Sequence, residues 1–282
     1  MRARKTRLVI PFVLGAFACA AAQAQTSPPT TQFTIGAKVW HASWLSYLPA
    51  TYSGISPSGQ PVIGDSVNAV EGKKQTNVLP QVALRHGRYF ASASHGRFSS
   101  DFNALTSPLI TPAGQTLITS RSDHLKRRES DLNLGYAVTP EVGLAIGYKD
   151  ATETRDVSLG IAPGRTPLLK TRVRGMLLGA VGSFAVYDKL RLYAQAGYGP
   201  ARLKADFLDR GMTLKTRGRY IIGEFGLSYP VFSSTNGLGG ATAAIGYRTQ
   251  TVKTDSYDNV FRESRDLRDV RDGVVLSLNF TM

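Results

Sequence analysis

The sequence predicts an all-β fold, a single antiparallel up-and-down transmembrane β-barrel of about ten strands, and three observations support this. Apolar residues recur at every second position in many short segments, which is the period of a β-strand. The opposite face of these segments is mostly Gly, Ala and Ser, which suits the crowded interior of a narrow barrel better than the surface of a soluble sheet. Tyrosines repeatedly close the apolar face, as they do in an interfacial aromatic girdle.

The N-terminal residues 1–24 read as a secretory signal peptide, which leaves a mature barrel domain of residues 25–282. Four basic residues precede an apolar stretch over 8–22, and "AQA" at 22–24 is a small-x-small cleavage site. An uncleaved anchor and a lipoprotein attached at Cys19 are the alternatives. Cys19 is the only cysteine, so the mature chain is expected to have no disulfide and no thiolate metal site. We expect no metal and no cofactor.

The charge balance is strongly basic. The chain has 34 basic and 20 acidic residues, and removal of the four basic residues of the signal leaves 34 − 4 − 20 = +10. In an exported protein this excess indicates anionic lipid head groups, an acidic glycan or an anion pathway, and not nucleic acid.

The strands can be placed in order by their alternation. In 131–138 the apolar face is Leu132, Leu134, Tyr136 and Val138, and the phrase "AIGY" at 145–148 and again at 244–247 sets glycine inside and tyrosine outside. An even count of eight or twelve strands is the alternative to ten. The predicted strands lie near 33–46, 77–86, 89–99, 127–138, 142–152, 172–185, 190–202, 218–229, 240–252 and 271–282. The predicted lipid-facing aromatic residues are Tyr136, Tyr148, Tyr198, Tyr229, Tyr247 and Phe280.

The connections between these strands alternate in length. Short turns are expected at 85–88, 139–141, 186–189 and 233–240. Long loops are expected at about 47–76, 100–126, 153–171, 203–217 and 253–270. Short turns on the periplasmic side and long loops on the extracellular side are typical of outer-membrane barrels.

The C-terminal stretch "RDGVVLSLNFTM" resembles the assembly signal of bacterial outer-membrane β-barrels. It has a polar Arg271, Gly273 two positions later, and apolar residues at alternating sites up to Phe280, although Met282 stands where Phe is usual. The resemblance, to the broad class of small Gram-negative opacity-type and porin-like barrels, implies location in the cell outer membrane and insertion by the barrel assembly machinery. It implies no substrate. We expect a monomer.

Two basic segments are candidates for contact with lipopolysaccharide phosphates. The first is Lys126, Arg127 and Arg128, where the fourth strand should emerge outside. The second is the run "RESRDLRDVRDG", which repeats an Arg–acid pair every three residues; its candidates are Arg262, Arg265 and Arg268. A charge run of this kind can equally be a self-paired, solvated loop.

One pair of residues suggests catalysis. His41 and Ser43 share a strand face that points toward lipid, and a His two residues from a Ser can activate it as a nucleophile. A membrane-embedded lipid acyl hydrolase would also need a third residue, for which Asn77 and Glu71 are candidates. The alternative is that both are interfacial polar residues. Of the two, we favour a chain that is not an enzyme.

The charges predicted to face the lumen decide between a plug and a pore. If the acids pair with the basic residues, the interior is a salt-bridged core; if arginines line one wall unpaired, it is an anion path. A ten-stranded barrel is near the lower limit for a water-filled channel, which favours a packed interior. The predicted lumen charges are Lys38, Arg85, Asp131, Lys149, Arg191, Glu224 and Arg248.

The sequence therefore predicts an outer-membrane barrel with a structural or interaction role, whose long basic loops contact lipopolysaccharide or external partners. A narrow, porin-like channel that favours anions is the first alternative. A lipid acyl hydrolase that uses Ser43 and His41 is the second.

Overall fold

The computed structural model describes residues 31–55, 61–110, 116–159, 164–208, 211–233, 239–254 and 267–282. The predicted signal peptide lies outside these residues. Ten strands make up the described part: β1 (Thr31–Ile55), β2 (Pro61–His86), β3 (Tyr89–Ile110), β4 (Thr116–Ala137), β5 (Val142–Leu159), β6 (Thr166–Tyr187), β7 (Leu190–Phe207), β8 (Met212–Ser233), β9 (Gly240–Thr254) and β10 (Leu267–Thr281).

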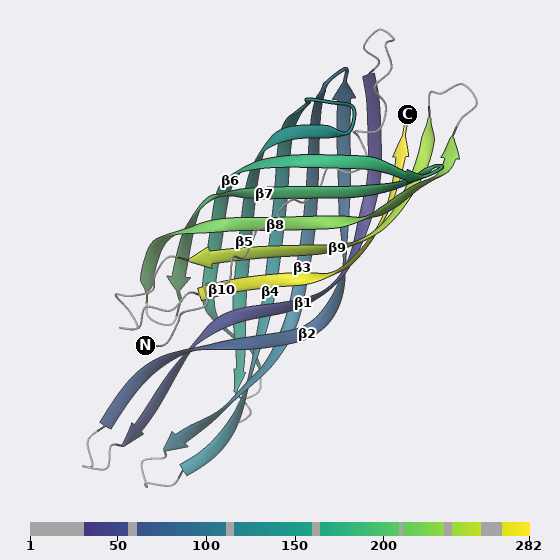
Figure 1. Cartoon of the computed structure of the whole chain (residues 1–282). Helices are drawn as coiled ribbons and strands as arrows, with labels where there is room; N and C mark the ends of the chain where they lie inside the picture. The colour runs from purple at the N-terminus through teal and green to yellow at the C-terminus, as the bar shows by residue number, and fades with distance from the viewer. Residues whose placement is uncertain are drawn as a thin grey trace, which may run out of the picture.

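The ten strands form one closed antiparallel barrel (Figure 1). Each strand pairs with its neighbours in the sequence, and β1 closes the barrel by pairing with β10 from Thr34↔Thr281 to Leu45↔Val270. The predicted all-β, up-and-down barrel of ten strands is confirmed. Closure leaves no free sheet edge around most of the wall, as a membrane-spanning β-structure requires.

The turns at the end that carries the C-terminus are short, and we call this the periplasmic end. β2 and β3 are joined by two residues, of which Gly87 has a φ of 57°, and Asp188 between β6 and β7 has a φ of 45°. Two-residue hairpins require this left-handed backbone, which Gly adopts freely and Asp tolerates.

At the other end the strands are longer than the sequence predicts. β1 continues to Ile55 and β2 begins at Pro61, so most of the long loop expected at 47–76 is strand, and the same holds for the loops expected at 100–126, 153–171 and 203–217. Most of the loop expected at 253–270 lies outside the described residues. The outward face becomes charged beyond the apolar band, so the hydrophobic alternation disappears although backbone pairing continues. The extended ends of β1 and β2 and those of β3 and β4 project as two separate hairpins (Figure 1).

The outer wall is apolar and the inner wall is packed. On β10, Val274, Leu276 and Leu278 are 44–50% exposed, whereas Val275 between them is 1% exposed. An exposed apolar band of this kind around a closed barrel is the surface that faces lipid. Among the described residues there is no helix long and apolar enough to cross a membrane.

The β2–β3 seam is the weakest part of the ladder. Its paired register runs only from Gln81↔Ser94 to His86↔Tyr89. Pro80 is the next residue on β2 and has no N–H to donate, which explains why regular pairing stops there. Beyond it the strands touch through side chains: Ser100 Oγ donates to the carbonyl of Lys73 at 2.9 Å.

Two apolar clusters lie inside the extracellular half of the barrel, on opposite walls. One comes mainly from β1, β3 and β4 and includes Trp40, Trp44, Phe98, Phe102 and Leu125. The other comes from β6 to β9 and is built around Val173, Leu177, Leu203, Phe207, Tyr220 and Ile222. The space between them holds the charged residues described next.

Candidate functional site

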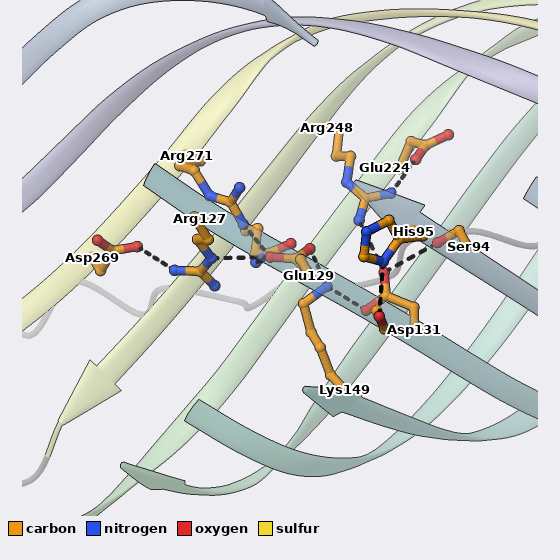
Figure 2. A network of polar contacts seen from close by, with 12 residues as sticks. Ser94, His95, Arg127, Glu129, Asp131, Lys149, Glu224, Arg248, Asp269 and Arg271 are labelled. Carbon is orange, nitrogen blue, oxygen red and sulfur yellow. Dashed lines mark hydrogen bonds and ion pairs between the residues drawn. The ribbon is translucent and has the colours of Figure 1, made fainter. Parts of the chain in front are cut away.

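The centre of the lumen is a buried carboxylate surrounded by cations (Figure 2). Glu129 on β4 points inward, and its side chain is only 2% exposed. It accepts hydrogen bonds from Arg127 Nε at 3.1 Å, from Gln250 Nε2 at 2.9 Å, and from Lys149 Nζ. Arg271 Nη2 on β10 donates to it at 2.5 Å. One acid thus joins three cations in the middle of the barrel.

The Glu129–Arg271 ion pair crosses the lumen. β4 and β10 are not neighbours, since β3, β2 and β1 separate them around the wall. A contact between them therefore spans the interior of the barrel. Because both charges are buried, loss of Glu129 would leave Arg271 without the carboxylate that it contacts, whereas loss of Arg271 would leave Glu129 with Arg127 and Lys149.

A second group of charges continues toward the periplasmic side. Lys149 also donates to Asp131 at 2.6 Å, and Arg248 lies 3.9 Å from the same carboxylate. Arg248 Nη1 donates to Glu224 at 3.2 Å, and Lys38 Nζ donates to Glu224 at 2.7 Å. These contacts link β5, β4, β9, β8 and β1 in one network. Figure 2 shows its members Lys149, Asp131, Arg248 and Glu224.

A third group lies on the extracellular side, above the apolar band. Arg127 Nη1 is 3.3 Å from Asp269 and 3.6 Å from Glu153. Trp44 Nε1 donates to Asp269 at 2.8 Å. Burial, together with the charge of Asp269, raises the pKa of Glu153 to about 7.

Aromatic rings surround the cation of the last strand. The Arg271 guanidinium lies 4.3 Å from the ring centroid of Phe98, 5.3 Å from Trp40 and 5.6 Å from Trp44. Arg248 lies 5.0 Å from the Trp40 ring. Cation–π contacts of this kind favour a desolvated arginine. The guanidinium groups of Arg271 and Arg248 therefore each contact both aromatic rings and carboxylates.

All seven predicted lumen charges lie on the inner wall. Arg85 Nε donates to the carbonyl of Gly87 at 3.0 Å, and Arg191 donates to Ser183 Oγ at 3.0 Å, both near the periplasmic end. The other five belong to the network: Lys38, Asp131, Lys149, Glu224 and Arg248. Glu129, the centre of the network, is not among the residues predicted to face the lumen.

One cavity next to the network is small. A cavity of about 30 Å³ lies between Asp131, Asn133, Gly147, Lys149 and Leu177. A water molecule needs roughly 10–15 Å³ on this measure, so the cavity accommodates one or two waters and no larger solute.

His41 and Ser43 lie on the outer wall, as expected, but each has a different partner. His41 Nδ1 and Thr76 Oγ1 are 2.9 Å apart. Ser43 Oγ donates to Asp272 Oδ1 at 3.1 Å. Within the described chain no hydrogen bond joins His41 to Ser43. Of the two candidate third members, Asn77 donates to the carbonyl of Gln75 at 3.5 Å and Glu71 is exposed on β2.

The predicted lipopolysaccharide contacts divide between the two walls. Lys126 and Arg128 are exposed on the outer wall of β4, and Arg268 is exposed on β10. Arg127 is not an outward residue: strand alternation turns it into the lumen, where it is 2% exposed. Arg262 and Arg265 lie outside the described residues. The six predicted lipid-facing aromatics are on the outer wall, 38–48% exposed.

A denser group of basic residues lies on the outer wall of β6, β7 and β8, and we call it the basic field. Its members are all exposed. Strand register places them in two cross-strand rows. The first row is Arg174, Arg202 and Arg217; the second row is Arg172, Lys204 and Lys215.

Two acids border the basic field. Asp150 on β5 accepts from Arg172 Nη2 at 2.6 Å and from Arg174 Nε at 3.2 Å. The hydrogen bond from Arg172 lowers the pKa of Asp150. Asp206 accepts from Lys204 at 2.9 Å, and its pKa is lowered by the hydroxyl of Thr213 and by Lys204.

The described residues contain no cluster of three or more His, Cys, Asp or Glu side chains that could hold a metal ion.

No protein-family model and no curated protein matches the sequence. Several solved structures match it. The outer-membrane protease OmpT from Escherichia coli is 11% identical, with 93% of this chain and 99% of that chain covered and a TM-score of 0.47. The Pseudomonas putida toluene transporter TodX is 10% identical, with 90% of each chain covered and a TM-score of 0.34. The outer-membrane protein OprG from Pseudomonas aeruginosa is 12% identical, with 90% and 96% covered and a TM-score of 0.28.

Protease and transporter are properties of those proteins, and identities near 11% carry neither to this chain. The fold follows from this chain's own strand pairing, apolar outer wall and polar interior. It is a closed ten-stranded antiparallel β-barrel of the outer-membrane type.

Proposed function

We propose that this protein is an integral outer-membrane barrel with a sealed lumen, and that it acts through its outer and extracellular surface in a structural or interaction role. The observation that carries the proposal is the Glu129–Arg271 ion pair, which joins opposite walls of the barrel. In this role the protein contacts lipopolysaccharide or external partners through the basic residues above the apolar band.

The pairing of the lumen arginines favours this role over an anion channel. Arg248 is paired with Glu224, and Arg127 and Arg271 are both paired with Glu129. An anion path needs cations whose charge is available to the passing ion. The inward charges of the network are instead neutralised by neighbouring carboxylates.

The outer wall gives less support to a lipid hydrolase. A nucleophilic serine needs its base within hydrogen-bond reach, and an acid or amide to orient that base. His41 instead faces Thr76, and the acid on this surface, Asp272, contacts Ser43 directly.

Ion flux from proteoliposomes tests the proposal. The barrel is refolded into vesicles loaded with potassium chloride and suspended in sodium nitrate of equal osmolarity, so that a released ion can exchange for an external ion of the same sign. Chloride and potassium release are followed separately with ion-selective electrodes. We expect both rates to match protein-free vesicles. Chloride release well above potassium release would establish the anion channel instead, and equal release of both would indicate an unselective pore.

A further inference from the structure

We propose that the basic field on the outer wall of β6, β7 and β8 is a binding site for the phosphate groups of an anionic glycolipid in the outer leaflet. The inference rests on the proposed function only for the position of the barrel in the outer membrane. It assigns the lipid contact to six residues of one wall, in place of the loop residues that the sequence suggests.

The arrangement of the field costs stability in the free barrel. Arg174 lies directly opposite Arg202, and Arg202 lies directly opposite Arg217 on the next strand. The second row repeats this order with three further cations. Directly opposed residues have Cβ atoms about 4.5–5.5 Å apart, where like charges repel. A bound anion between the rows would remove this repulsion.

The described residues do not supply enough acids to do so. Asp150 and Asp206 border the field at its edges. Across the described chain, no acidic side chain lies within ion-pair distance of Arg202, Arg217 or Lys215. The centre of the field therefore presents exposed cations to an external anion.

The height of the field matches a layer of lipid phosphates. Arg174 is two residues beyond Met176, which is exposed on the apolar band of β6. On β7 the last outward aromatic before the field is Tyr198, whose ring is half-exposed. Two residues along a strand rise about 7 Å. The first row thus lies directly above the hydrocarbon, where lipid head groups carry their phosphates.

The side chains are suited to phosphate. Four of the six members are arginines, and a planar guanidinium forms paired hydrogen bonds to two phosphate oxygens. Asp150 holds Arg172 and Arg174 at 2.6 and 3.2 Å, which fixes the two β6 guanidiniums beside each other.

On the outer wall of β3 and β4, some basic residues are paired with acids and others are not. Arg97 and Arg128 face each other on β3 and β4, but Lys126 is paired with Asp156 at 3.1 Å and His124 with Asp101 at 2.6 Å. Positive and negative charges alternate there. That wall provides a control with the same number of removable charges.

The test uses diphosphoryl lipid A and lipid A from which both phosphates have been removed. The full barrel is refolded in zwitterionic micelles, and bound lipid is measured by native mass spectrometry. The field variant carries Arg174→Gln, Arg202→Gln and Arg217→Gln. The matched control carries Arg97→Gln, Lys126→Gln and Arg128→Gln. Heat-modifiable migration in gels checks that each variant is folded.

We expect the field variant to bind diphosphoryl lipid A about 100-fold more weakly, because each basic group near an anionic lipid surface contributes roughly fivefold. The control should lose no more than about threefold, and dephosphorylated lipid A should bind weakly to all three proteins. Equal losses in both variants would reduce the effect to general charge and overturn the proposal. Binding that does not depend on the phosphates would overturn it too.

A second variant keeps the test open if the first fails to fold. Asp150→Asn releases Arg172 and Arg174 from their carboxylate and should tighten binding of diphosphoryl lipid A about fivefold; unchanged or weaker binding contradicts the proposal. Ion flux measured on the same preparations separates the two claims. If the barrel conducts ions but binds diphosphoryl lipid A through the basic field, only the sealed lumen is refuted. If the barrel does not conduct and its lipid binding does not depend on the field, only the lipid site is refuted.

Discussion

Replacement of Glu129 by glutamine should destabilise the barrel more than any other single loss of charge in the lumen. Glutamine keeps the size of the side chain and removes its charge. Lys149 retains Asp131, and Arg127 retains Asp269 and Glu153, but Glu129 is the acid that pairs with Arg271. Removal of one partner of a buried ion pair costs about 3–5 kcal/mol, so we expect a loss of this size in the free energy of unfolding.

The two tryptophans of the chain provide the assay. Trp40 and Trp44 both lie against the Arg271 guanidinium, so their fluorescence reports on the network itself. Wild type and Glu129→Gln are refolded into vesicles and unfolded with urea while the emission is followed. Asp150→Asn is the control, because it removes a carboxylate that is also bonded to two arginines but lies on the exposed outer wall. Such a surface pair contributes about 0–1 kcal/mol.

A difference below about 1 kcal/mol in the free energy of unfolding between Glu129→Gln and wild type would refute the reasoning. Loss of a buried ion pair is expected to cost clearly more than loss of an exposed one, which contributes at most about 1 kcal/mol. An equal loss in Asp150→Asn would refute it as well, since the effect would then not depend on burial.

Three further predictions follow from the same structure. Glu153→Gln should change the pH dependence of unfolding. The ordinary pKa of this acid is 4.5, and its pKa in the folded barrel is about 7. Between these pH values the unfolded chain releases a proton that the folded barrel keeps, so the stability of the wild type falls as the pH rises. The variant should therefore gain relative to wild type from pH 5 to pH 8, by up to about 3 kcal/mol in urea titrations; a constant difference over this range would contradict the prediction. Gly246→Ala should lower stability by about 1–3 kcal/mol, because an added Cβ would lie 2.4 Å from the carbonyl oxygen of Phe225 and 2.5 Å from Tyr193 Oη; urea unfolding at the wild-type midpoint would contradict this. Ser43→Ala should leave any lipid acyl hydrolysis by the refolded barrel unchanged, since Ser43 contacts Asp272 and not His41; loss of a measurable activity in this variant would restore the hydrolase.

The barrel itself could be predicted from the sequence because lipid imposes a simple pattern. Leu132, Leu134 and Tyr136 face outward, and the residues between them face inward, so one short segment sets the phase of a whole strand. The pattern ends where the outward residues become charged. For this reason the sequence predicts loops where the strands extend beyond the apolar band.

The same phase, carried backward along β4, would have located the centre of the network. Counting from Leu132 in steps of two places Arg128 outside and both Arg127 and Glu129 inside. The prediction instead places Lys126, Arg127 and Arg128 together where the fourth strand emerges outside, so it assigns Arg127 to lipopolysaccharide and leaves Glu129 out. Contacts across the lumen could not be predicted, because the Glu129–Arg271 pair joins residues 142 positions apart and depends on the curvature of the closed wall.

The basic field was missed for a related reason. Its six residues are spread over three strands, and each strand alone has only two of them. The charge becomes dense only when register brings the rows together. A run of adjacent charges, such as the Arg–acid repeat, attracts attention in a sequence, but in its described part Arg268 faces outward and Arg271 faces the lumen.

Single-channel recording in a planar bilayer tests the central claim, a sealed lumen, most directly. Refolded wild type and Glu129→Gln are compared at the same protein density, with a salt gradient across the bilayer. The buried network predicts that the wild type shows no conductance and that the variant shows intermittent openings. A steady conductance from wild type would contradict it, because ions would then pass where Glu129 and Arg271 meet.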